Sequence, residues 1–563
     1  MNNFLRILKN KLGFYLNILN TNKLISYLCV FSIFFVIFAF TYMTTNNLSS
    51  SDDHYFHIRF AEQMRQVGFL DSFNNFKAVY FSKSAHGISY MYYNFLFYLL
   101  LIPFTFIVPL YLGIKLYAVF ILAVISVSMY FVFRSLKITN AFLWTAGFFA
   151  VVGLSPLFRL FLSRPYVLAP TILLFVLLFL HKKKYVLVLI SSCLYVIWHG
   201  ATFFLPFFIG CSYFISNILY TRKYNWKILI YTFSGVLGGV AITYLFGHGF
   251  FTYINDDLIS VLKDFLSNKK INIPEGNELY PKNFFDFINQ NVLFFFLFMV
   301  SIVSGCVIYF KKYTDNKKEN FRILDDSDTL VLSLFLISTV FFVAISSFSN
   351  RFSDFFIFFG WIFIVLILNL IIKNISFNTV VVKNGFFSGI LIAMLYLFGN
   401  NLLQIRDFFG SNPNTFVNIG NYIDRNVPKG DIVFDTNWSW FPQLYYYAPN
   451  VNYVVGLEPK LTYQYNQEIY WLWSHIGDGY VCNVESCQDK MDSIKKLSDE
   501  KFAKKWKKEE GDAMAEILIN KFSSHTVVTS KDYRALNFVL QNNDRFKLEL
   551  KDNNLYVYTV LNK

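Results

Sequence analysis

The feature that most constrains this chain is a series of long apolar runs between residues 24 and 403, the first from Leu24 to Thr44. A bilayer core contains no water to satisfy backbone N–H and C=O groups, so apolar segments of about 20 residues cross it as α-helices. Only 15% of the residues are charged, whereas an ordinary soluble domain has about 25%. We therefore expect a polytopic α-helical membrane protein with about 11 to 13 transmembrane helices.

Clusters of basic residues between the runs predict the orientation. Examples are Lys182 to Lys184, Lys311 with Lys312, and Lys373 to Lys383. Cytoplasmic loops carry an excess of Lys and Arg. We therefore expect residues 1–23 to be a cytoplasmic amphipathic lead-in and the loops 45–89 and 247–290 to face outward. The net charge of +14 lies in such clusters, which indicates topology and not nucleic-acid binding. A bacterial inner (cytoplasmic) membrane fits this pattern.

The number of runs conflicts with this orientation. About twelve runs can be delimited, but a cytoplasmic N-terminus and an outward C-terminus require an odd number of spans. Proline residues interrupt two regions, 90–134 and 156–170. Proline removes a backbone donor within a helix, so we expect a broken or additional helix in one of them.

The composition changes after residue 403. Residues 404–563 predict a small extracytoplasmic α/β domain, because short β-rich runs alternate there with polar helical stretches. The β-rich runs are 431–435, 452–457, 526–529, 546–550 and 555–561, and the helical stretches are 415–426, 489–508, 512–522 and 531–541. Cys482 and Cys487 lie close together there. A local disulfide in an oxidising compartment is the favoured interpretation, because no second Cys or His pair accompanies them to bind a metal.

The first outer loop contains a cluster of ionisable residues. Two carboxylates can ligate a divalent cation or take a proton from an attacking hydroxyl group, and an arginine can bind a phosphate through two hydrogen bonds. The alternative is an amphipathic helix whose apolar side lies on the bilayer. The cluster consists of Asp52, Asp53, His54, His57 and Arg59.

Further candidates lie in segments that the predicted topology places outside. Glu275 and Glu278 belong to the second outer loop. This loop is either a mobile segment that brings a carboxylate into a site or an ordinary turn. Arg351 occupies a tight turn between two spans and suits a lipid phosphate or diphosphate; the alternative is a snorkelling interfacial arginine.

Three more residues extend this set of possible phosphate ligands. Arg159 and Arg164 place positive charge on the outer side, against the usual charge bias. His199 ends a span on the same side and has the chemistry to donate to a phosphate oxygen, the alternative being a satisfied interfacial histidine.

The order of these motifs resembles the GT-C superfamily of membrane glycosyltransferases, most closely the catalytic subunit of bacterial and archaeal oligosaccharyltransferases. The resemblance implies sugar transfer from a polyprenyl-phosphate or diphosphate carrier on the exoplasmic face. It implies that Asp52 or Asp53 is the first-loop base or metal ligand, that Glu275 or Glu278 is the outer-loop acid, and that Arg351 contacts the donor phosphates.

The chain departs from that family at two motifs. Ser163-Arg164-Pro165-Tyr166 stands where a second acidic motif is expected, and Asn437-Trp438-Ser439-Trp440-Phe441 replaces the Trp-Trp-Asp acceptor signature. We therefore expect an inverting transferase without a cofactor, in which arginines neutralise the leaving phosphate and Trp438 and Trp440 line an acceptor cleft. Its partners would be membrane lipid, the polyprenyl-linked donor and a protein, lipid or glycan acceptor.

Two alternatives remain. One is a metal-dependent protein oligosaccharyltransferase holding Mg²⁺ or Mn²⁺ through Asp52, Asp53 and Glu278. The other is a lipid-carrier flippase or transporter, although transporters usually show internal repeats and the long outer loops are asymmetric.

Overall fold

The computed structural model describes residues 23–48, 53–68, 71–72, 78–81, 94–246, 273, 280–316, 326–374, 380–456, 458–494 and 500–562. Asp52, Glu275 and Glu278, named above as site candidates, lie outside these residues. The chain forms two compact units. The first comprises Met1–Ser49, Lys115–Ala241 and Glu278–Gly410, and the second comprises Ser50–Ile114, Ile242–Asn277 and Ser411–Lys563.

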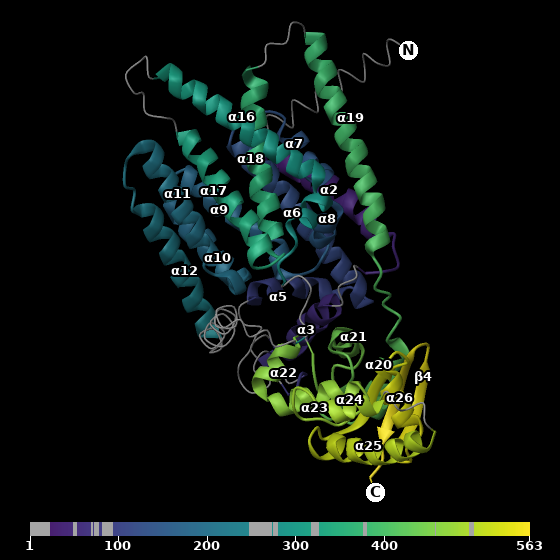
Figure 1. Cartoon of the computed structure of the whole chain (residues 1–563). Helices are drawn as coiled ribbons and strands as arrows, with labels where there is room; N and C mark the ends of the chain where they lie inside the picture. Colours follow the sequence, from purple (N-terminus) through teal and green to yellow (C-terminus); the bar gives the residue numbers. More distant parts are fainter. Residues whose placement is uncertain are drawn as a thin grey trace, which may run out of the picture. The chain divides into compact units, whose positions relative to one another are not determined.

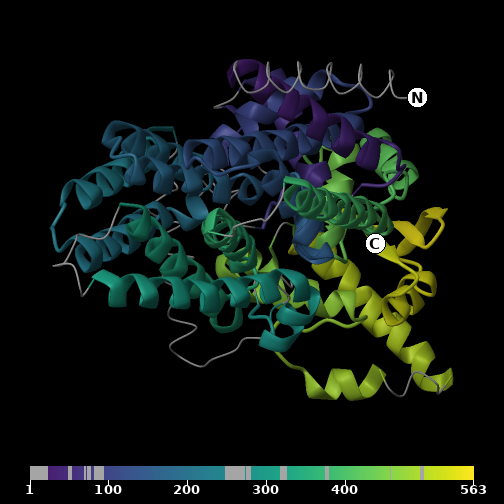
Figure 2. The same cartoon turned by 90° about the horizontal axis from the view of Figure 1, so that it is seen from above.

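The first unit is a bundle of apolar helices. Among the described residues, 8 helices are long and apolar enough to cross a membrane, or up to 9 if a bent pair counts as one span. In both views α11 and α12 lie at one side of this bundle and α2 and α19 at the other (Figures 1 and 2). The helices are α2 (Lys23–Met43), α6 (Leu110–Ser135), α7 (Ala141–Val151), α8 (Leu154–Leu160), α9 (Ala169–His181), α10 (Tyr185–Trp198), α11 (Leu205–Thr221), α12 (Lys227–Phe246), α15 (Phe284–Gln290), α16 (Val292–Asn316), α17 (Asp326–Ser347), α18 (Phe352–Asn374) and α19 (Val380–Ile405).

Aromatic side chains hold the bundle together. The Phe149 ring lies 5.6 Å from that of Phe34, 5.1 Å from Phe38 and 5.8 Å from Phe398, centroid to centroid. These residues come from α7, α2 and α19, so one ring cluster joins three helices that are distant in sequence. Aromatic pairs at this spacing contribute about 0.5–1.5 kcal/mol each beyond the area that they bury.

Both proline-containing regions depart from single straight spans. Helices α7 and α8 meet at a bend of 112°. In the region 90–134, the described residues before α6 form a short helix α5 (Phe95–Leu101) followed by the 3-10 helix η3 (Ile102–Phe106). Proline at positions 103 and 109 removes backbone donors, which explains why no continuous helix crosses this stretch.

The second unit contains a five-stranded mixed sheet in the order β2-β1-β3-β5-β4. Strand β1 (Ile432–Asp435) pairs in parallel with β2 (Asn452–Tyr453) and β3 (Ser524–Ser530). Strand β5 (Leu555–Val560) pairs antiparallel with β3 and with β4 (Phe546–Asp552). The predicted α/β character of the C-terminal region is therefore present.

Helices surround this sheet. Two polar helices expected over 489–508 and 512–522 are instead a short α24 and one long α25, which passes through Gly511 without a break. The remaining helices include three that the sequence analysis missed, α21 to α23. The set is α20 (Val417–Asn426), α21 (Phe441–Tyr447), α22 (Pro459–Tyr465), α23 (Gln467–Gly477), α24 (Gln488–Ile494), α25 (Glu500–Asn520) and α26 (Arg534–Gln541).

Part of the first outer loop belongs to this same unit. Helix α3 (Asp53–Val67) packs on α21, with the Phe56 and Tyr445 rings 5.6 Å apart. Its apolar residues Phe56, Phe60 and Met64 are buried in protein. The alternative in which that side of the helix rests on the bilayer is therefore wrong.

A second piece of the loop joins the sheet. Val79 forms a parallel bridge with Tyr453 of β2. Tyr453 N donates to Ala78 O at 2.7 Å, and Tyr80 N donates to Tyr453 O at 2.9 Å. Residues 78–81 therefore occupy the β2 edge, which would otherwise offer unpaired backbone groups.

Candidate functional site

A buried ion pair organises the polar part of the first unit. Arg159, in the last turn of α8, donates from Nε to Asp354 Oδ1 at 3.0 Å and from Nη2 to Asp354 Oδ2 at 2.8 Å. Arg159 is 7% exposed and Asp354 6% exposed. The Arg159 guanidinium also lies 4.7 Å from the Tyr166 ring centroid. The pair joins α8 to the first turn of α18, where a carboxylate is favoured by the helix dipole.

Arg351 immediately precedes α18. Its backbone N donates to Ser349 Oγ at 3.2 Å, and Asn350 N donates to Tyr280 O at 3.0 Å. Lys282 N donates to Ile345 O at 3.1 Å. The turn that carries Arg351 is therefore held by the segment at 280–282, the last part of the second outer loop.

The end of α10 is tied to the segment that carries Arg164. Trp198 Nε1 donates to Pro165 O at 2.6 Å, which links the residue before His199 to the residue after Arg164. His199 Nδ1 is buried and has no hydrogen-bond partner within the described residues. Burial, and secondarily the Arg351 guanidinium, lower the pKa of His199 to about 3. His199 is therefore neutral at pH 7 and close enough to Arg351 to interact with it electrostatically.

Lys282 is a member of this cluster that the sequence analysis missed. Burial lowers its pKa, Asp286 raises it and Arg159 lowers it. The ammonium group donates to Gln290 Oε1 and is close enough to Arg159 to interact with it electrostatically. The signal in the sequence is its position at the end of the second outer loop, in Tyr280-Pro281-Lys282.

The cluster carries more positive than negative charge. Arg159, Lys282 and Arg351 contribute cations, whereas Asp354 is a buried acid and Asp286 an exposed acid that acts on Lys282. Arg164 adds a further cation in the segment tied to the end of α10. Asp354 occupies the Nε and Nη2 donors of Arg159, so Arg159 is held by the protein. An excess of cations beside a neutral imidazole is chemically suited to an anion such as a phosphate group.

The first-loop candidates belong to the second unit. Asp53 opens α3 and is half-buried, whereas His54 is fully buried. His57 Nδ1 shares a hydrogen bond of 2.9 Å with the Tyr98 hydroxyl. Arg59 Nε donates to Tyr446 O at 2.6 Å, with its guanidinium 5.1 Å from the Tyr446 ring centroid and an ion pair to Glu62. The contacts of Arg59 with Tyr446 hold α3 on the C-terminal region.

Trp438 and Trp440 follow β1 directly. Asn437 begins their 3-10 turn, because its Oδ1 accepts from Ser439 N at 3.0 Å. Both indole rings are half-buried. The Trp440 ring lies 6.0 Å from the Phe416 ring and 6.0 Å from the Tyr533 ring. The turn thus presents aromatic surface at the end of a buried strand.

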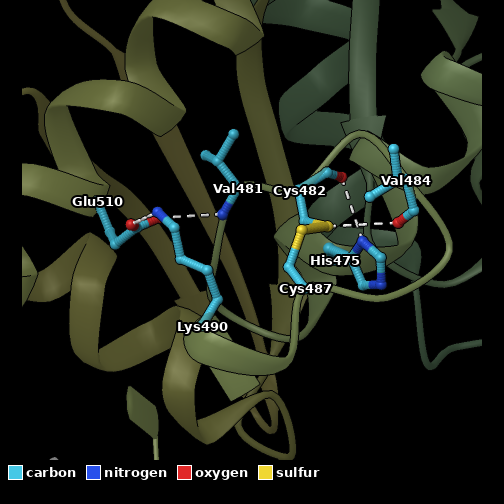
Figure 3. The surroundings of a disulfide bond; sticks show 7 residues. All are labelled: His475, Val481, Cys482, Val484, Cys487, Lys490 and Glu510. Carbon is cyan, nitrogen blue, oxygen red and sulfur yellow. Dashed lines mark hydrogen bonds and ion pairs between the residues drawn. A yellow bond between two sulfur atoms is a disulfide. The ribbon is translucent and has the colours of Figure 1, made fainter. Parts of the chain in front are cut away.

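Cys482 and Cys487 form a disulfide in the second unit (Figure 3). His475 Nδ1 lies 3.1 Å from Cys482 O, and Val481 N donates to Glu510 Oε2 at 3.0 Å. Glu510 also pairs with Lys490, just beyond the second cysteine. The disulfide loop is thereby attached to α23, α24 and α25.

Within the described ranges, no three His, Cys, Asp or Glu side chains lie together in a way that could hold a metal ion. The metal ligands suggested by the resemblance were Asp52, Asp53 and Glu278, and two of these fall outside those ranges.

No protein-family model and no curated protein matches this sequence. Solved structures do match. The apo crystal structure of ArnT from Cupriavidus metallidurans aligns with a TM-score of 0.52 and 10% identity, covering 95% of this chain and 98% of that one. A structure of the same protein bound to undecaprenyl phosphate aligns with a TM-score of 0.49 and 11% identity, covering 96% and 98%. The chain therefore shares the overall fold of ArnT.

Proposed function

We propose that this chain is an integral membrane glycosyltransferase. It moves a sugar or oligosaccharide from a polyprenyl-phosphate or diphosphate carrier to an acceptor on the exoplasmic face. The observation that carries the proposal is the cationic cluster around Asp354, in which Arg159, Lys282 and Arg351 accompany a neutral His199. Arg164 lies in the adjoining segment, which is tied to the end of α10. The cluster occurs in a chain that shares the overall fold of ArnT.

The cluster would stabilise the negative charge that develops on the leaving phosphate group. When the bond between the anomeric carbon and the phosphate oxygen breaks, its electron pair stays on that oxygen. Cations and N–H donors aimed at an oxygen that gains charge lower the barrier without reorganising. Arg351 and Arg164 supply charge, and His199 supplies a neutral N–H donor. Arg159 holds the start of α18 through Asp354.

The acceptor would lose a proton in the same step. Its hydroxyl oxygen forms the new bond to the anomeric carbon from the opposite face, so the configuration inverts. Asp52 or Asp53 takes the hydroxyl proton as general base. This assignment rests on the resemblance and on the half-buried position of Asp53 at the start of α3.

Native mass spectrometry of the purified full chain with C55 polyprenyl phosphate tests the donor site. We expect Arg351→Ala to weaken binding at least about tenfold, because charge-assisted hydrogen bonds are worth about 1.5–3 kcal/mol. Arg222→Ala, which removes an exposed arginine of the same unit, is the matched control. Equal binding by both variants, or no binding by the unaltered chain, would overturn the proposal.

Sugar transfer in membranes tests the base. Asp52→Ala and Asp53→Ala, singly and together, are compared for transfer from a radiolabelled lipid-linked sugar pool. We expect the double variant to lose at least about 100-fold in rate, in line with the contribution of a general base. Full transfer by the double variant would remove both residues from the mechanism.

A further inference from the structure

The topology of the sheet singles out one end of strand β1. The chain passes from β1 to β2 on one side, and then crosses to β3 on the other side of β1. All three strands are parallel, so their carboxyl ends meet at one edge. In open α/β sheets, ligands bind outside the carboxyl ends of the strands at the point where the connections diverge in this way.

Three segments converge at that edge. The first follows β1, where Thr436 N donates to Val528 O of β3 at 3.1 Å. The second follows β3 and carries Tyr533, whose ring lies 6.0 Å from Trp440 at an interplanar angle of 83°. The third is the end of α23, where a Cβ on Gly477 would lie 3.7 Å from Tyr533 Cε1 and 3.8 Å from Thr436 O.

Asp478 lies in this third segment and is exposed. The following residue, Gly479, has a φ of +92°, and a Cβ there would come within 2.7 Å of the Ala535 backbone. Glycine is therefore required in the turn after Asp478, where the backbone passes close to α26. The carboxylate also acts on Tyr533, because burial and, secondarily, Asp478 raise the pKa of the Tyr533 hydroxyl to about 12.

The side chains gathered here combine aromatic faces with hydrogen-bonding groups. The half-buried rings of Trp438, Trp440 and Tyr533 supply the faces. The Asn437 Oδ1 already accepts from Ser439 N and Ser439 Oγ, which fixes the orientation of its amide. Asp478 adds a carboxylate acceptor. Amphipathic rings beside amide and carboxylate groups suit a ligand that is apolar on one face and rich in hydroxyl groups.

We propose that Asn437, Trp438, Trp440, Asp478 and Tyr533 form a binding site for a carbohydrate portion of the acceptor. The proposal rests on the proposed function, because it supplies the acceptor side of that transfer. The acidic group within the cluster disfavours a phosphate ligand. A peptide would bind most simply by adding a strand, but residues 78–81 already occupy the neighbouring β2 edge.

Saturation-transfer NMR tests the site on the full chain in lipid nanodiscs. The probe is a panel of short soluble oligosaccharides of hexose and N-acetylhexosamine units. We expect at least one member to receive saturation on its ring protons. Asp478→Asn and Trp440→Leu should each weaken that binding about tenfold or more, equivalent to loss of one strong contact. Asp544→Asn and Tyr465→Phe alter exposed residues elsewhere in the same unit and should change nothing.

The outcomes separate this site from the donor site. Absence of binding by every oligosaccharide, or unchanged binding by Asp478→Asn and Trp440→Leu, would overturn the carbohydrate site. Binding of C55 polyprenyl phosphate by the same unaltered sample would leave the proposed transferase standing in that case. Because Asp478 is exposed, its amide variant is expected to fold, and its thermal midpoint should match that of Asp544→Asn.

Discussion

Arg159 and Asp354 are 195 positions apart in the chain, and they form a buried two-point ion pair between the end of α8 and the start of α18. Neither residue is more than 7% exposed. A buried pair with two directed hydrogen bonds fixes both distance and orientation. The pair therefore sets the geometry of the turn that carries Arg351, three residues before Asp354.

Removing one partner should destabilise the first unit. Asp354→Asn leaves the Arg159 cation buried near Lys282 without its counter-charge, and breaking such a pair costs about 3–5 kcal/mol. Thermal unfolding of the purified chain in detergent would show this as a lower midpoint. Asp407→Asn, at an exposed acid of the same unit, is the control. Equal midpoints for the two variants would contradict the structural role given to the pair.

His199 should act as a neutral donor throughout the physiological range. Because burial and Arg351 lower its pKa to about 3, the imidazole does not change charge between pH 5.5 and 8. Transfer by His199→Gln, which keeps a neutral N–H donor, should stay within several-fold of the unaltered chain, and His199→Ala should lose about tenfold. An inflection of the rate near pH 6.5 that disappears in His199→Gln would show that the histidine titrates.

Asp435 should make the second unit less stable as the pH rises. Burial raises its pKa to about 8, although Val454 N and Val455 N donate to its Oδ1 at 3.1 and 3.3 Å. An unfolded aspartate has a pKa of about 3.9, so between these values the folded state binds one more proton. Its stability should fall by up to about 1.4 kcal/mol per pH unit across that window.

Hydrogen exchange of β1 and β3 at pH 5 and pH 8, corrected for intrinsic rates, measures this loss. Asp435→Asn keeps an acceptor oxygen but cannot ionise, so it should remove the pH dependence and protect the strands better at pH 8. Asp544→Asn should behave like the unaltered chain. A pH-independent protection in the unaltered chain would mean that Asp435 is ionised in the folded state.

The disulfide should stabilise the loop that it closes, residues 482–487, and the helices α23 and α24 on either side. Closing a loop of this length contributes about 2 kcal/mol in the chain-entropy account. Replacing Cys482 and Cys487 together by Ser should therefore speed hydrogen exchange in α23 and α24, which the loop joins (Figure 3). A chain with the cysteines of the first unit replaced should react with maleimide in intact cells only after reduction. Labelling without reductant would indicate that the bond does not form.

Residues that are near in sequence were predicted well. Long apolar runs predict spanning helices, and β-rich runs alternating with helical stretches predict an α/β domain. Both signals are contained within short stretches of sequence. The strands over 431–435, 546–550 and 555–561 were expected within a few residues of β1, β4 and β5. A broken or additional helix was also expected in one of the two proline-containing regions, since proline acts on its own turn.

Contacts between distant residues could not be predicted in this way. Arg159 was expected to bind a phosphate, but nothing in its neighbourhood indicates that Asp354 occupies its Nε and Nη2 donors. The apolar side of α3 suits a bilayer and a protein surface equally, and only its burial against α21 distinguishes them. Tyr533 and Asp478 carry no motif, and they join Trp440 solely because the crossover from β2 to β3 brings three segments to one edge.

The sequence by itself determined that this protein is a bundle of membrane-spanning helices followed by an α/β domain, because backbone desolvation and hydrophobic periodicity act within single segments. The tertiary structure decided which charges are paired and which surfaces are covered. Charge pairing and surface burial depend on contacts between segments far apart in the chain. The free energy of such a contact depends on both residues, and the local sequence around one of them does not identify the other.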